Sequence, residues 1–340
     1  MNKLIFGVIG AGKIGKLHIE NILQYLPCVQ IKSVADPYVD EAWIKDKAIS
    51  KLVRDADKVI DDEEIDAILI CSPTPLHAMQ IIRAARAGKH IFCEKPIAMT
   101  TEEITLAIEA VKQAGVKLQI GFNRRFDPNF AKMKRMLCNQ DIGSPYTLRI
   151  TSRDPEIPTA EYLQTSSGMF LDMTIHDFDM ARFLMGSEID EVYATGSVLV
   201  DPIFKQFDDV DTAIVNLKFT NGSLGVIDNS RQAVYGYDQR VEVFGSKGKI
   251  HAENNLPTNI SWSTKDGINS EKPLHFFLGR YKDAYIAEMQ AFFACIVNDV
   301  SPAVTGMDGL ISVIVSMAAK KSLIENRPVK VNYEHWKHLT

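Results

Sequence analysis

The stretch that most constrains the fold lies near the N-terminus. Residues 3–23, "KLIFGVIGAGKIGKLHIENIL", have the pattern of a buried strand, a glycine-rich turn and a helix with apolar residues at helical spacing. Such a turn can occur without a ligand, but between strand and helix it is the dinucleotide-binding fingerprint. In that setting Gly10 makes the tight turn, Gly12 lets the backbone approach a pyrophosphate, and Gly15 lets helix and strand pack closely. Phosphates are expected at the helix N-terminus, so Lys13 and Ile14 join the cofactor-binding candidates.

A second strand, "VQIKSVADP", ends in Asp36. An acid at this position can accept hydrogen bonds from both hydroxyls of the adenosine ribose, and its charge repels a 2′-phosphate. The sequence therefore favours NAD over NADP, although nearby Lys13 weakens that preference. Strand, turn, helix and acid together predict a dinucleotide site.

Strands and helices continue to alternate up to residue 122. The segments "DAILICSP", "KHIFCEKPIAMT" and "VKLQIGF" begin as nearly all-apolar strands, which indicates a parallel sheet buried on both faces. Ligands of such sheets lie beyond the carboxyl ends of the strands. This rule adds the following cofactor-binding candidates: Ser72, Pro73, Thr74, His77, Glu94, Lys95 and Asn123. Any of them can instead cap a helix or hold a loop, but a lysine that leaves a buried strand before a proline is hard to explain that way. Residues 1–122 are predicted to form an α/β Rossmann domain.

Residues 123–340 have a different pattern and predict an α+β domain with a large, mostly antiparallel open sheet. Residues 145–154, 191–200, 211–232, 239–254 and 259–266 alternate in polarity, with turn signals at Asn221-Gly222 and Ser246-Lys247-Gly248. Helices are expected over about 168–185, 281–297 and 306–325. An open sheet of this size needs cover, and a partner subunit is one way to supply it.

The segment "GMFLDMTIHDFD", residues 168–179, is apolar yet carries several ionisable groups. At helical spacing Asp172, His176 and Asp179 share one narrow stripe of a helix that is apolar almost all round. Burying unpaired charge costs several kcal/mol. The stripe is therefore either an internal hydrogen-bonded cluster or the wall of a polar cavity, and the segment alone leaves both readings open.

Composition excludes several classes of protein. The 340 residues are 46% hydrophobic and 24% charged, without an apolar run long enough to span a bilayer. A net charge of −5 argues against a nucleic-acid partner. The five cysteines are scattered without a C-x-x-C pair, which predicts no metal site and suits a reducing cytoplasm. No targeting peptide is recognisable, because a strand begins almost at once.

Several motifs together resemble the Gfo/Idh/MocA oxidoreductase family, and within it the inositol-dehydrogenase branch. The resemblance covers the whole chain and is carried by Gly10–Gly15, Asp36, the triplet Glu94-Lys95-Pro96, and residues 121–130, 168–179 and 226–248. It implies that Lys95, Asp172 and His176 form the catalytic group and contact the substrate, and that the Lys95–Pro96 peptide is cis. It also implies substrate contacts from Arg125 and Tyr235, with Asp154 in "SRDPE" a weaker match.

The implied activity is NAD-dependent oxidation of a cyclitol hydroxyl, from myo- or scyllo-inositol to the keto-inositol, in inositol catabolism by a cytoplasmic homotetramer. Histidine is the natural general base near neutral pH, so His176 is expected to take the hydroxyl proton. Asp172 would orient the ring, and Lys95 would stabilise the developing alkoxide. In so tight a group the titrations are coupled, so the sequence does not say whether Lys95 or His176 owns the proton. Asp179 is expected to be structural.

Three other functions remain open at this point. Related proteins include other sugar dehydrogenases and glycosidases that retain NAD and oxidise their substrate transiently. A non-enzymatic NAD-sensing regulator is the third, and the intact set Lys95, Asp172 and His176 weighs against it, because a sensor has no need of all three.

Overall fold

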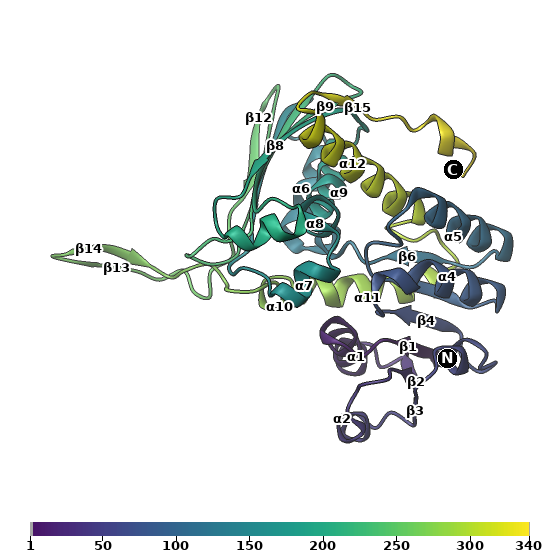
Figure 1. Ribbon diagram of the computed structural model, residues 1–340. Helices are drawn as coiled ribbons and strands as arrows, with labels where there is room; N and C mark the ends of the chain where they lie inside the picture. Colours follow the sequence, from purple (N-terminus) through teal and green to yellow (C-terminus); the bar gives the residue numbers. More distant parts are fainter. Residues whose placement is uncertain (1–2, 340) are drawn as a thin grey trace. The chain divides into compact units, whose positions relative to one another are not determined.

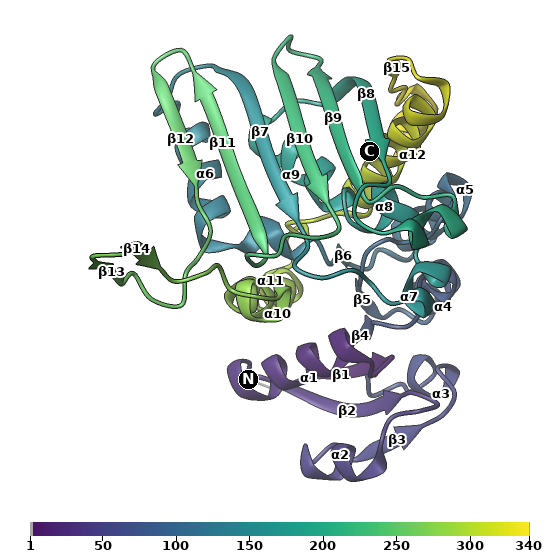
Figure 2. The same ribbon diagram turned by 60° about the vertical axis from the view of Figure 1, so that its left-hand side comes forward.

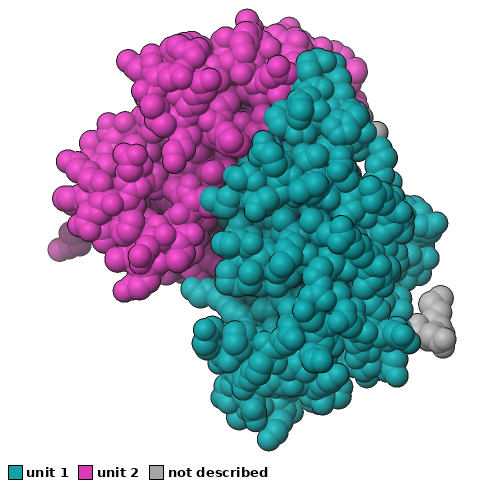
Figure 3. All heavy atoms as spheres, turned by 45° about the vertical axis from the view of Figure 1, so that its right-hand side comes forward, with its two compact units in different colours: residues 1–123, 283–313, 333–340 teal, residues 124–282, 314–332 magenta. Residues whose placement is uncertain are grey.

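The computed structural model describes residues 3–339 and divides into two compact units (Figure 3). The first unit runs to Asn123 and also takes Asp283–Val313 and the stretch from Tyr333; the second comprises Arg124–Lys282 and Ile314–Asn332. The boundary predicted after residue 122 lies one residue from the observed one. The prediction that everything beyond it belongs to the second domain differs from the structure, because two C-terminal stretches return to the first unit.

The first unit is a six-stranded parallel sheet with strand order β3-β2-β1-β4-β5-β6 (Figure 1). Its elements are β1 (Leu4–Ile9), α1 (Lys13–Tyr25), β2 (Val29–Ala35), α2 (Glu41–Asp46), β3 (Lys51–Val53), α3 (Asp57–Ile60), β4 (Ala67–Ile70), η1 (Thr74–Leu76), α4 (His77–Arg86), β5 (His90–Cys93), α5 (Thr101–Ala114), β6 (Leu118–Ile120), α11 (Lys282–Val297) and η4 (Glu334–Leu339). This is the doubly wound dinucleotide-binding order, in which the winding reverses between β1 and β4. The predicted Rossmann fold is confirmed.

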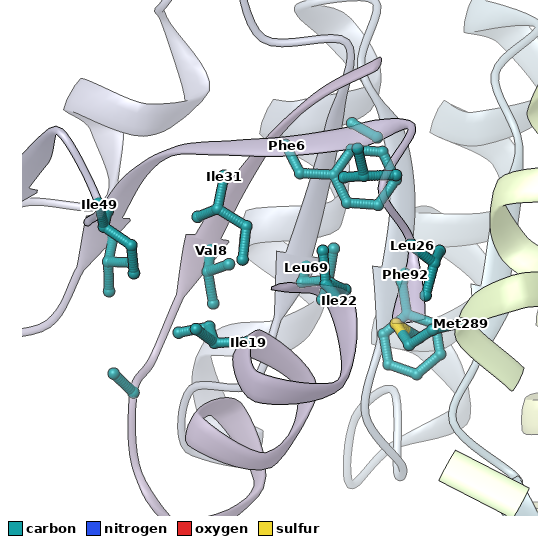
Figure 4. Close-up of a cluster of buried hydrophobic side chains, with 14 of the residues drawn as sticks. Phe6, Val8, Ile19, Ile22, Leu26, Ile31, Ile49, Leu69, Phe92 and Met289 are labelled. Carbon is teal, nitrogen blue, oxygen red and sulfur yellow. The ribbon is translucent and has the colours of Figure 1, made fainter. Parts of the chain in front are cut away.

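A single apolar cluster explains why α11 belongs to this unit (Figure 4). Phe6 of β1 and Ile19 of α1 are fully buried in it, together with Met289 and Phe292 of α11. The ring centroids of Phe6 and Phe292 lie 5.8 Å apart. An apolar helix pattern shows that a face is buried but not which sheet it covers. The sequence therefore could not assign α11 to the first unit.

The second unit is built on a seven-stranded sheet with strand order β12-β11-β7-β10-β9-β8-β15 (Figure 2). Its elements are η2 (Asn123–Phe126, whose first residue belongs to the first unit), α6 (Pro128–Cys138), β7 (Pro145–Arg153), α7 (Ala160–Thr165), α8 (Gly168–Asp172), α9 (Ile175–Met185), β8 (Ile189–Ser197), η3 (Pro202–Phe207), β9 (Thr212–Phe219), β10 (Leu224–Ser230), β11 (Asp238–Gly245), β12 (Gly248–Ala252), β13 (Ser261–Thr264), β14 (Gly267–Ser270), α10 (Phe277–Arg280) and β15 (Val329–Lys330), with α12 (Gly306–Glu325) shared between the units. β7 and β10 run parallel and the other neighbouring pairs run antiparallel, so the sheet is mostly antiparallel, as predicted. Helices α6 and α9 cover one face.

The predicted turns join the predicted strands. Asn221-Gly222 connects β9 to β10, with Gly222 in the left-handed region at φ +87°, and Gly245 pairs with Gly248 across the second turn. The sequence analysis counted residues 259–266 among the strands of the large sheet. In the structure β13 instead pairs with β14 in a separate exposed hairpin that extends away from that sheet (Figures 1 and 2).

The single helix predicted over residues 168–185 is wrong in one respect, because the structure divides it into α8 and α9. At the break the N–H groups of Met173 and Thr174 both donate to the Met169 carbonyl at 2.9 Å. The buried Thr174 hydroxyl donates to Asn229 of β10 at 2.7 Å, and this long-range bond anchors the break to the sheet. Within residues 3–339, no helix is both long and apolar enough to cross a membrane.

Candidate active site

The glycine turn of the first unit leaves an open helix N-terminus. Gly10 has φ +91°, and a Cβ there would lie 2.5 Å from the Cys71 carbonyl oxygen. A Cβ on Gly15 would lie 2.0 Å from the Gly10 oxygen, so strand and helix approach too closely for any other residue. At Gly12, by contrast, no described atom would come within 4 Å of an added Cβ. Gly10 and Gly15 have the turn and packing roles that the sequence predicts, and the space beside Gly12 is open. Helix α1 begins directly afterwards at Lys13, followed by half-buried Ile14.

Asp36 lies beside this turn, at the end of β2. One carboxylate oxygen accepts from the Ala11 N–H at 2.7 Å, and the other accepts from the N–H groups of Tyr38 and Val39 at 2.7 and 2.8 Å. The acid is thereby fixed, while Oδ2, which accepts only from Ala11, keeps a lone-pair site for a ribose hydroxyl. Arg54, which the sequence analysis missed, donates to the Asp36 backbone carbonyl at 3.0 Å and so brings a cation to this strand end.

The loops after β4 and β5 are tied together by a buried histidine. The two ring nitrogens of His77 lie 2.6 Å from the Ser72 carbonyl oxygen and 2.8 Å from the Pro96 carbonyl oxygen. Burial lowers the pKa of His77, against the opposing effect of the two carbonyls. The contacts support a role in holding the loops rather than the predicted contact with the cofactor. The Lys95–Pro96 peptide that His77 contacts is cis, as the family resemblance implied.

The other candidates at these strand ends differ in burial and in hydrogen bonding. The Ser72 hydroxyl donates to Gln80 of α4 at 2.6 Å, so it is engaged within the unit. Pro73 is exposed, and Thr74 begins the short η1 helix. Asn123 is buried, and its side-chain nitrogen has no hydrogen-bond partner among the described residues. This N–H₂ group can therefore donate to a bound molecule.

The Glu94 side chain points into the protein, whereas the sequence analysis predicted that it contacts the cofactor. Its carboxylate lies 2.7 Å from Nε2 of fully buried His18 on α1 and fills the space where a Cβ on Gly121 would lie, 2.9 Å away. Glu288 of α11 completes the cluster, 3.9 Å from the same histidine nitrogen. Burial and the neighbouring Glu94 charge hold the pKa of Glu288 well above its usual range. Nothing in the local sequence pattern signalled His18 or Glu288.

The open glycine turn, the fixed Asp36 and the unpaired Asn123 amide fit a bound dinucleotide. Gly12, Lys13 and Ile14 would hold its pyrophosphate and Asp36 its ribose, while Lys95, half-buried after β5, lies at the same carboxyl edge of the sheet. Such a cofactor supplies a hydride acceptor.

In the second unit, Asp172 is held from two sides. The Tyr162 hydroxyl donates to its Oδ1 at 2.7 Å, and the Arg231 guanidinium donates to its Oδ2 at 3.1 Å. The same guanidinium donates to Asp154 at 3.3 Å, so Asp154 and Asp172 share one partner. His176 lies four residues after Asp172, in the first turn of α9. Sequence reasoning proposed Asp154, Asp172 and His176 but missed Tyr162 and Arg231.

The remaining substrate candidates are also paired. Arg125 makes a two-point contact with Asp179 of α9, at 2.8 and 2.5 Å, and not with nearby Asp127. Asp179 therefore forms a side-chain pair with a residue of η2. The Tyr235 hydroxyl donates to Asp238 at 2.6 Å and accepts from Arg153 at 3.0 Å.

Beneath these groups lies a buried ion pair that the sequence analysis missed. Arg124 donates to Asp177 of α9 at 2.6 Å, and Asn229 of β10 donates to the other oxygen at 2.9 Å. Asp177 is fully buried. This network fixes α9, and hence His176, against the sheet.

Comparisons with known proteins show the family to which the chain belongs. Residues 4–122 match the family model described as "Oxidoreductase family, NAD-binding Rossmann fold", and residues 130–251 match the GFO/IDH/MocA C-terminal domain. The chain belongs to the Gfo/Idh/MocA oxidoreductase family. The predicted family, fold class and cofactor, NAD, are thereby confirmed.

Three relatives show how far the similarity extends. The chain is 49% identical to the uncharacterized oxidoreductase YrbE of Bacillus subtilis, with 97% of each chain covered. It is 48% identical to the myo-inositol 2-dehydrogenase of Thermotoga maritima, over 96% of this chain and 98% of that one. It superposes on the crystal structure of scyllo-inositol dehydrogenase from Lactobacillus casei with bound NAD(H) and scyllo-inositol with a TM-score of 0.91, at 29% identity over 97% and 99% of the two chains.

Proposed function

We propose that the protein is an NAD-dependent inositol 2-dehydrogenase, which oxidises one ring hydroxyl of myo- or scyllo-inositol to the ketone. One observation carries the proposal: the chain has Lys95, Asp172 and His176 in the motifs described above, and it matches relatives named as inositol dehydrogenases over nearly its full length. The first unit supplies the NAD site and Lys95, and the second unit carries the other polar groups assigned to the substrate.

The residues divide the chemistry among them. His176 takes the proton of the reacting hydroxyl as general base. Asp172 orients the imidazole and stabilises its cationic form. Lys95 donates a hydrogen bond to the reacting oxygen and stabilises the negative charge that develops there.

The contacts with the other hydroxyls are assigned to Arg125, Asp154 and Tyr235. A cyclitol presents hydroxyls all round its ring, so its site needs donors and acceptors that are fixed in place. Each of these side chains is fixed by a charged partner: Asp179, Arg231 and Asp238 respectively. A guanidinium has five N–H donors, of which Asp179 takes two from Arg125.

A substrate panel tests the proposal. Purified protein is incubated with myo-inositol, scyllo-inositol, glucose or xylose and with NAD or NADP, and NADH or NADPH formation is followed by absorbance. Stoichiometric reduction of NAD by an inositol supports the dehydrogenase. A tightly held cofactor that is not consumed during glycoside cleavage would instead favour an NAD-retaining glycosidase. Binding of NAD without any turnover would favour a regulator.

The proposal extends to assembly as a homo-oligomer, with a tetramer as the expected size. The face of the large sheet opposite α6 and α9 carries exposed Ile214, Leu224 and Phe244, and the β13–β14 hairpin exposes Trp262 and Ile268. Exposed apolar groups gathered in this way are typical of subunit contacts. Light scattering after gel filtration measures the mass, and a monomer at micromolar concentration would contradict this part.

A further inference from the structure

Arg231 links two acids that come from distant parts of the second unit. Its backbone N–H directly follows β10 and donates to the Asp211 carbonyl at 2.8 Å, and its side chain is 3% exposed. Nη1 donates to Asp154 after β7 at 3.3 Å, and Nη2 donates to Asp172 at the end of α8 at 3.1 Å. One buried guanidinium therefore fixes the end of a strand and the end of a helix at once.

The charge balance of this group is unequal. Asp154 and Asp172 contribute two negative charges, and Arg231 contributes one positive charge. Burial raises the pKa of Asp154, the nearby Arg231 lowers it, and the Asp172 charge raises it again. Without the guanidinium the two carboxylates would oppose each other's ionisation. The guanidinium between them opposes that effect on both carboxylates, although burial still leaves the pKa of Asp154 above its usual value.

We propose that Arg231 is a positioning residue for alcohol oxidation: it keeps Asp172 ionised and correctly oriented, so that Asp172 can stabilise the imidazolium formed at His176. The inference rests on the proposed function of His176. When His176 takes the proton, the ionised Asp172 carboxylate would stabilise the new positive charge. The stabilisation is therefore greater after proton transfer than before it, as catalysis requires.

Other charged and titratable groups also face this cluster. The Arg231 variants described below leave these groups unchanged. They are Tyr162 of α7, which donates to Asp172; Asp209, which accepts from the N–H of Met169 at the start of α8; and Arg124, which acts on Asp154 through its charge. Because Tyr162 binds the Asp172 oxygen that Arg231 does not, Tyr162→Phe tests orientation without removing the positive charge.

The experiment compares Arg231→Met, which removes the charge, with Arg231→Lys, which keeps it. Asp172 acts as a carboxylate, so activity falls as pH decreases through its pKa, and loss of Arg231 raises that pKa. We expect Arg231→Met to move the acid limb of kcat/KM for inositol upward by about one pH unit or more. Arg231→Lys should lie between this variant and the wild type. Affinity for NAD, measured by tryptophan fluorescence, should change little, because the NAD-binding residues belong to the first unit.

Arg182→Met is the matched control. Arg182 of α9 makes a comparable two-point pair with Glu188, at 2.6 and 2.7 Å, and has no assigned role in the reaction. Its loss should lower the melting temperature and leave the pH profile unchanged. If Arg231→Met behaves in the same way, Arg231 is structural and the inference is overturned.

A readout that does not need turnover separates this inference from the proposed function. Carboxyl carbons of ¹³C-labelled aspartate are titrated by NMR in the wild type and in both Arg231 variants, and Asp172→Asn identifies the Asp172 signal. The midpoint for Asp172 should rise in Arg231→Met and rise less in Arg231→Lys. If the Asp172 midpoint is unchanged in Arg231→Met, the inference is overturned even if the wild type oxidises inositol. If the midpoint rises but the wild type does not oxidise inositol, only the proposed substrate is contradicted.

Discussion

The Asp36 carboxylate accepts a hydrogen bond from the Ala11 N–H at 2.7 Å, which fixes the acid at the end of β2 against the glycine turn after β1. A carboxylate in this place receives ribose hydroxyls and repels a 2′-phosphate. We expect NAD to be preferred over NADP by at least about tenfold in kcat/KM, equivalent to about 1.4 kcal/mol. Asp36→Ser should narrow the gap, as measured by initial rates with each cofactor.

Arg54 provides the control for this prediction, because its guanidinium lies against the Asp36 carbonyl. Arg54→Gln should lower the residual NADP activity more than the NAD activity. Equal use of both cofactors by the wild type would contradict the role of Asp36, and Arg54 and Lys13 would then be the cations to remove.

His176→Ala and Lys95→Ala test the assigned chemistry. Each should lower kcat by about 10² or more, the scale for loss of an acid–base group or of a contact to the developing oxyanion. NAD affinity should fall much less, because the residues proposed to hold the pyrophosphate and the ribose, Gly12 and Asp36, are not changed. His251→Ala on β12, an exposed position, should retain its kcat. A catalytic variant that keeps most of its kcat would show that its residue is structural.

Tyr235→Phe tests the contacts with the other hydroxyls. Loss of one hydrogen bond to the substrate should lower kcat/KM for inositol by about 1–3 kcal/mol, because the partner groups are left unpaired. Tyr193→Phe is the control: its hydroxyl contacts Asn326 at 3.2 Å at an exposed position, and its kcat/KM should stay unchanged. Equal values for Tyr235→Phe and wild type would remove Tyr235 from the substrate site.

The buried pair Arg124–Asp177 should contribute to stability. Asp177→Asn leaves a buried guanidinium without its counter-charge, so we expect the free energy of unfolding in urea to fall by about 3–5 kcal/mol. Glu242→Gln breaks the more exposed pair with Lys249 and should cost about 0–1 kcal/mol. Similar losses in the two variants would contradict the structural role of Asp177.

Local patterns were enough to predict much of the fold. The roles of Gly10, Gly12 and Gly15 follow from backbone sterics within one strand–turn–helix unit, and the β9–β10 hairpin follows from Asn221-Gly222 between alternating strands. In both cases the residues that determine the structure are neighbours in sequence.

Long-range pairing was beyond the reach of the same reasoning. The partners Arg124 and Asp177 are 53 residues apart, and Arg231 and Asp172 are 59 apart. A helix pattern shows that Asp177 is buried but not which cation it meets. The break at Thr174 and the return of α11 to the first unit depend on equally distant contacts, with Asn229 and Phe6.

The central claim is that the protein oxidises an inositol with NAD. The most direct test is a comparison of kcat/KM for myo-inositol, scyllo-inositol and glucose, each with saturating NAD, under one set of conditions. The account predicts a higher kcat/KM for at least one of the two inositols than for glucose. A site built to bind the hydroxyls of an inositol leaves some of its polar groups unpaired when a substrate that matches it less well is bound. A clear preference for glucose or another pyranose would contradict the assigned substrate and leave the fold and the NAD site standing.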